Sequence, residues 1–93
     1  MTIGLLRVVL RLDEANSLKD KRRVVKSLLD RVSGKFNAAC AETGSLDLWN
    51  EAELAFVTVS NDRRHANSML DTIRGYVEAN AQAEVTEAEI ELI

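Results

Sequence analysis

The chain of 93 residues contains no proline, one cysteine and one histidine. A single cysteine excludes a disulfide within the chain, and small secreted domains usually depend on such cross-links. No apolar run approaches the ~20 residues of a membrane-spanning helix. Arg7 and Arg11 interrupt the apolar N-terminal segment, which therefore does not match a signal peptide. These absences predict a cytoplasmic protein without a membrane partner.

Several kinds of catalytic chemistry are also missing. Metal sites need converging ligands, and the only soft ligands, Cys40 and His65, do not fall at zinc spacing. The glycines are scattered and form no phosphate-binding loop. Cys40 is expected to be a packed thiol and His65 a solvated residue at the start of a helix. The sequence therefore predicts no catalytic residue, no metal and no cofactor, and so a protein that is not an enzyme.

What is present indicates one domain spanning residues 1–93. There is no linker, repeat or low-complexity stretch, and 46% of the residues are hydrophobic, as in ordinary globular domains. Apolar residues alternate along residues 2–12, which predicts a strand with one buried face; they are Leu6, Val8, Leu10 and Leu12.

Two helices follow from apolar residues at helical spacing. Ser17 is expected to cap the first helix, which carries a buried stripe from Leu18 to Phe36 and can stop at Gly34. Asn61 or Asp62 is expected to cap the second helix.

Three further strands are predicted at residues 37–43, 52–60 and 85–92. The resulting β-α-β-β-α-β order predicts an α+β ferredoxin-like sandwich, a four-stranded antiparallel sheet with both helices on one face. The expected strand order is fourth, first, third, second. Arg7 and Arg11 would then face outward beside the glutamates of the last strand, Glu87, Glu89 and Glu91.

Charge is divided unevenly along the chain. Residues 1–35 hold nine Lys and Arg against four Asp and Glu, whereas residues 36–93 hold three against eleven. Most of the positive charge lies on the first helix, in Lys19, Lys21, Arg22, Arg23, Lys26 and Arg31. One interpretation is that these cations bind the phosphates of an RNA backbone. The other is an ordinary solvated helix face, whose long side chains cover apolar surface.

Aromatic residues add little to the RNA interpretation. The usual RNA-recognition form of this topology stacks bases on aromatic residues of its central strands, and the first strand here has none. Trp49, in a loop, is the one remaining candidate for stacking. The alternative is that Trp49 covers the edge of the core.

A resemblance to a known family covers nearly the whole chain. The segment Ser17–Leu28, SLKDKRRVVKSL, resembles the hallmark of the YlxP-like family of uncharacterised bacterial proteins. Other motifs agree, at Phe36-Asn37, Glu42, Asp47-Leu48-Trp49 and Ser60-Asn61-Asp62, whereas Asp20 stands where the family often has Glu. The resemblance implies the ferredoxin-like fold. It also implies a link to ribosome maturation or translation, with ribosomal RNA or a ribosomal subunit as the partner, and it gives the RNA interpretation priority.

A second hypothesis concerns the uncovered face of the sheet. Ile3, Leu5 and Val9 would leave apolar area exposed there, and such patches tend to mark contacts. The alternative function is therefore a homodimeric protein-interaction module that joins through this face and has no role with nucleic acid.

Overall fold

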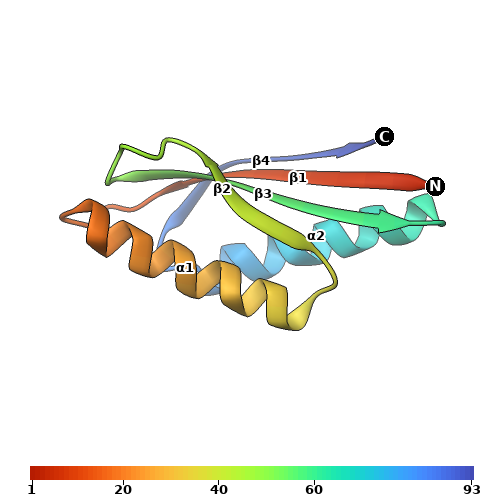
Figure 1. The fold of residues 1–93 in the computed structure, drawn as a ribbon, viewed down its shortest axis with the longest axis horizontal. Helices are drawn as coiled ribbons and strands as arrows, with labels where there is room; N and C mark the ends of the chain where they lie inside the picture. The colour runs from red at the N-terminus through yellow and green to blue at the C-terminus, as the bar shows by residue number, and fades with distance from the viewer.

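The computed structural model describes all of residues 1–93 (Figure 1). Its elements follow the predicted order: β1 (Thr2–Arg11), α1 (Leu18–Lys35), β2 (Ala39–Gly44), β3 (Glu51–Ser60), α2 (Arg63–Asn80) and β4 (Glu84–Leu92). The strands form one sheet in the order β2-β3-β1-β4, and each neighbouring pair is antiparallel. The ferredoxin-like prediction is therefore confirmed, including its strand order.

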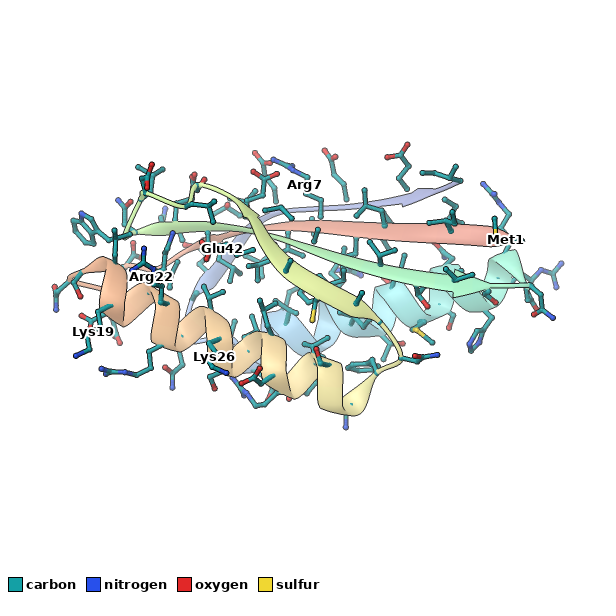
Figure 2. The ribbon with its side chains drawn as sticks, in the orientation of Figure 1. Met1, Arg7, Lys19, Arg22, Lys26 and Glu42 are labelled. Atoms are coloured by element: carbon teal, nitrogen blue, oxygen red, sulfur yellow. The ribbon has the colours of Figure 1, made fainter.

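Both helices cover the same face of the sheet, and side chains fill the layer between them (Figure 2). Leu6, Val8 and Leu10 of β1 point into this layer and are completely buried, as their alternation predicts. They join a cluster of 14 buried apolar residues drawn from β1, the β1–α1 connection, β3 and both helices. The opposite face of the sheet is left without a covering layer.

Local sequence explains where the helices begin and end. The Ser17 hydroxyl accepts a hydrogen bond from the Asp20 backbone N–H at 3.1 Å, so the predicted cap of α1 is confirmed. Asp62 caps α2 by accepting from Arg64 and His65. The predicted stop at Gly34 is wrong, since helix α1 continues to Lys35 and ends where Phe36 turns extended. Gly34 takes no left-handed conformation.

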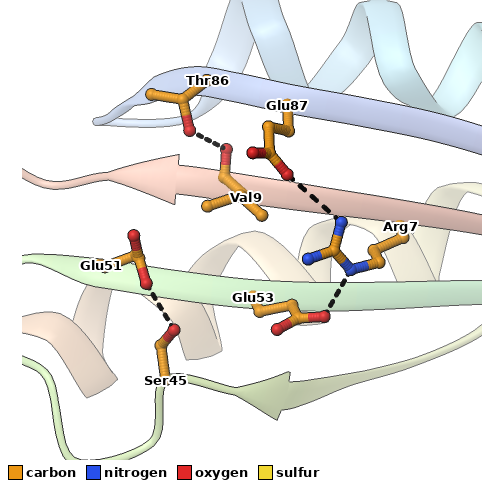
Figure 3. A network of polar contacts seen from close by, with 7 residues as sticks. All are labelled: Arg7, Val9, Ser45, Glu51, Glu53, Thr86 and Glu87. Carbon is orange, nitrogen blue, oxygen red and sulfur yellow. Dashed lines mark hydrogen bonds and ion pairs between the residues drawn. The ribbon is translucent and has the colours of Figure 1, made fainter.

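The charged end of the uncovered sheet face is held together by ion pairs (Figure 3). The Arg7 guanidinium donates to Glu53 of β3 and Glu87 of β4, and these bonds, that to Glu53 above all, raise the pKa of Arg7 above its ordinary value. Arg11 pairs with Asp13 and Glu84. The prediction that Arg7 lies beside Glu87 is confirmed, but Glu89 and Glu91 form no ion pair with either arginine.

A β-bulge explains the different partner of Arg11. The pairing of β1 with β4 shifts between Val9 and Leu10, which places Glu84 opposite Arg11. The shift also packs Val85 against the core, while the Thr86 hydroxyl donates to the Val9 carbonyl at 3.3 Å (Figure 3).

The same network corrects the predicted dimer face. Glu53 and Glu87 are the register partners of Val9 on its two sides, and Arg7 bridges both of them. Val9 is consequently only 9% exposed and does not offer apolar surface. Ile3 and Leu5 are half-buried and still face the uncovered side, beside Val57 and Val59 of β3.

Candidate nucleic-acid interface

The outer surface of α1 carries most of the predicted cationic residues. Five of the six are exposed: Lys19, Arg22, Arg23, Lys26 and Arg31. In Figure 2, Lys19, Arg22 and Lys26 lie along the first half of α1, with Lys19 at the end of the molecule where the β2–β3 loop turns. The helix itself thus presents the charge that the sequence predicted.

The exposed cations differ in what they contact. Lys26 pairs with Asp30 at 2.8 Å, one helical turn away. The Arg31 guanidinium donates to the Ser27 and Asn80 carbonyls at 3.3 and 3.4 Å. Arg31 thus pairs with no carboxylate, but its guanidinium is engaged by backbone carbonyls. Three of the exposed cations form neither an ion pair nor a side-chain hydrogen bond, and these are Lys19, Arg22 and Arg23. They are the ones free to receive an anion.

The cations are spread around the helix and do not line a single groove. Arg22 and Lys26 border a hollow of about 490 Å³ between α1 and β2, which Cys40 and Glu42 also line. Arg23 borders a separate hollow of about 210 Å³ beside the β1–α1 connection. This arrangement suits a flexible polyanion that follows a surface better than a small ligand held in a pocket.

Lys21 corrects the predicted set. Its side chain is completely buried, and its Nζ lies 2.9 Å from Glu42 Oε2. The ammonium donates to the carbonyls of Ser45 at 2.8 Å and Glu51 at 3.1 Å, and more weakly to that of Leu46 at 3.5 Å. Glu42 Oε2 has no hydrogen bond of good geometry, so attraction between charges holds this pair. Lys21 is therefore an internal anchor and cannot reach a phosphate.

The spacing of the buried stripe explains why Lys21 turns inward. Lys21, Val25, Leu28 and Val32 are the buried residues of α1 and share one side of the helix. Lys21 extends that stripe by one turn toward the N-terminus. Its position four residues before Val25 is the signal that could have identified it.

Trp49 lies in the β2–β3 loop and is not among the residues that form or pack against the buried core cluster. Its surface is 47% exposed, and two neighbours in the loop are similar, Leu46 at 55% and Leu48 at 47%. Three large apolar side chains thus face solvent from one short segment.

The remaining candidate residues lie apart from this surface. The Cys40 thiol is within hydrogen-bond distance of the Ser33 hydroxyl, at 3.0 Å, and is half-buried. His65 is exposed in the first turn of α2 beside Arg63 and Arg64, which are also exposed and form no ion pair. Sequence reasoning gave those two arginines no role. No helix here combines the length and the apolar character that a bilayer crossing requires.

Comparison with known proteins places the chain in a family. A family profile described as "Protein of unknown function (DUF503)" matches residues 3–90. The chain belongs to this family. It is 33% identical over 73 residues to the uncharacterized protein YlxP of Bacillus subtilis (strain 168), a match that covers 78% of this chain and 79% of that protein. The resemblance seen in the sequence is thereby confirmed.

A solved structure supports the fold separately. The chain is similar to a de novo designed protein with a ferredoxin fold, determined by NMR in solution. The TM-score is 0.54 at 18% identity, and the match covers all of this chain and 83% of the designed one. A similarity of this kind shows the fold alone.

Proposed function

We propose that this protein is a non-catalytic, RNA-binding accessory factor in ribosome maturation or translation. It would contact RNA backbone through α1. The observation that carries the proposal is the contrast in pairing among the cations. Lys19, Arg22 and Arg23 are exposed without a carboxylate partner, whereas the sheet arginines Arg7 and Arg11 are both paired.

The chemistry of these residues suits phosphate. Each phosphate that a lysine or arginine neutralises releases condensed counterions, so binding is favourable and falls steeply with salt. Such contacts carry little sequence information, because the backbone is the same for every base. Cations spread over the surface of a helix can bind an RNA-rich particle, because contacts with its phosphates need no deep pocket. The ribosomal setting is what the family resemblance in the sequence implies, and co-sedimentation with ribosomal subunits across a salt series tests it.

A matched pair of variants tests the helix. Arg22 and Arg23 are adjacent on α1, and Arg63 and Arg64 are adjacent on α2, all four exposed and without ion pairs. The double variants R22Q/R23Q and R63Q/R64Q remove the same charge from different surfaces. Binding is measured by anisotropy of a fluorescent single-stranded RNA of about 12 nucleotides, a length within the range that single-strand-binding folds cover.

The two variants are expected to differ. R22Q/R23Q should weaken binding and lower the slope of log affinity against log salt by about 1.4, at about 0.7 for each lost phosphate contact on a single strand. R63Q/R64Q should retain the slope of the natural protein. Equal losses would indicate diffuse attraction by any basic residue. No loss in R22Q/R23Q would overturn the role of α1.

One observation favours self-association as a second function. Val59 is 62% exposed and pairs with Ile3 on the uncovered sheet face, next to the pair of Leu5 and Val57. A second copy of the chain could cover this apolar end through a symmetric contact. Light scattering should then give a dimer that V59E converts to a monomer. A monomer at high micromolar concentration would rule the dimer out.

A further inference from the structure

The β2–β3 loop exposes apolar side chains, yet its backbone is firmly held. The buried Lys21 ammonium donates to carbonyls at both ends of the loop, those of Ser45 and Glu51. The Ser45 hydroxyl donates to Glu51 at 2.6 Å, as Figure 3 shows. The Leu48 N–H closes a turn on the Ser45 carbonyl at 3.0 Å, and the Leu12 N–H ties Asn50 to the end of β1 at 2.9 Å.

Because its backbone is anchored, the loop presents the flat ring of Trp49 from a rigid segment. Removing a lysine from water is costly, and here the compensating bonds go to a surface loop. A loop fixed before binding loses less conformational freedom when a partner arrives. Trp49, Leu46 and Leu48 therefore form a preorganised apolar surface.

The same anchoring places the loop beside the unpaired cations. Lys21 lies on α1 between Lys19 and Arg22 in sequence, and its hydrogen bonds bring the loop against the first turns of that helix. Figure 2 shows Lys19 and Arg22 at the end of the molecule where this loop turns. An aromatic ring and free cations thus share one end of the molecule.

We propose that the β2–β3 loop and the first turns of α1 form one binding surface for single-stranded RNA. An unpaired base stacks on Trp49, while Lys19 and Arg22 contact the neighbouring phosphates. This inference rests on the proposed function and names the class of RNA. Stacking platforms beside cationic tracks are the usual means of binding single strands. The bases of a duplex are stacked inside it and are not available to Trp49.

Asp47 is exposed in the loop, between Leu46 and Leu48 in sequence, and its carboxylate would repel phosphate. In the proposed arrangement the backbone therefore follows the cations of α1, and the base turns to the loop. Lys21 is a positioning residue in this arrangement, because it holds the loop and touches no RNA.

The test uses the single tryptophan of the chain as the probe. The natural protein is titrated with single-stranded RNA of about 12 nucleotides and with an RNA duplex of the same length. Trp49 emission is followed together with the anisotropy of the labelled RNA. We expect the single strand to bind more tightly and to quench Trp49, and the duplex to leave the emission unchanged.

Variants separate this inference from the proposed function. W49A should weaken single-strand binding about tenfold and leave duplex binding as it is, whereas W49F should recover most of the loss. R22Q/R23Q should weaken the binding of both the single strand and the duplex. Single-strand binding without quenching, or an unaffected W49A, would overturn the stacking site and leave the role of α1 intact; the loop would then be a protein contact. Failure to bind either RNA would overturn the proposed function itself.

Discussion

The sheet and the first helix handle similar charged residues in opposite ways. On the sheet, Arg7 is shared between Glu53 and Glu87, and Arg11 between Asp13 and Glu84. On α1, Arg22 and Arg23 are exposed and have no such partner. The number of cations on an element therefore does not by itself identify a binding surface. What identifies it is whether the fold already supplies their counter-charges.

Lys21 provides the largest expected effect, because it is the one cation of α1 that belongs to the interior. K21M leaves the buried Glu42 Oε2 without its counter-charge and removes the hydrogen bonds from Lys21 to the Ser45 and Glu51 carbonyls. Breaking a buried pair from one side costs about 3–5 kcal/mol. Urea unfolding should show a loss of that size.

A double variant provides the control. Replacing both partners, in K21M/E42M, removes the stranded charge as well, so part of the stability should return. The E42M change alone should also be destabilising, since it strands the Lys21 ammonium. An unchanged unfolding midpoint in K21M would show that the buried pair is not formed.

A smaller effect is expected from replacing the arginines of the sheet and those of α1. R7Q breaks the bridge over Val9 and should lower the urea midpoint slightly, and by more than R11Q, whose partners are all exposed. R22Q/R23Q should change the free energy of unfolding by less than about 0.5 kcal/mol, as ordinary surface substitutions do. The same double variant should nevertheless lose RNA affinity. If R22Q/R23Q destabilised the fold more than R7Q, the α1 arginines would be structural, and the contrast would fail.

Much of the fold could be predicted because its signals are local. Alternation fixed the inward face of β1, and Ser17 identified the start of α1, since both depend only on neighbours in the chain. The β-bulge at Val9 could not be predicted, because it arises from the pairing of β1 with a strand more than seventy residues away. The ion pair between Arg11 and Glu84, which follows from the bulge, could not be predicted for the same reason.

The candidate site was predictable in part. Exposure of Lys19, Arg22 and Arg23 follows from their side of the helix. The charge of Lys21 predicts exposure to solvent, whereas its position in the buried stripe of α1 predicts burial, and the structure follows the stripe. A buried lysine needs acceptors, and these come from Glu42 and the loop that follows β2, which helical periodicity alone does not reveal.

The burial of Lys21 also has a consequence for the chemistry of the lysine amines. Reagents that acylate or methylate amines require access to a free nitrogen lone pair. Lys19, Lys26 and Lys35 are exposed to solvent, whereas the Lys21 nitrogen is enclosed by Glu42 and the carbonyls of Ser45, Leu46 and Glu51. Labelling should therefore mark the three surface lysines and spare Lys21 until the chain unfolds. In one peptide map, the labelling of Lys21 would therefore measure unfolding. The labelling of Lys19 would measure whether a bound partner covers the helix surface.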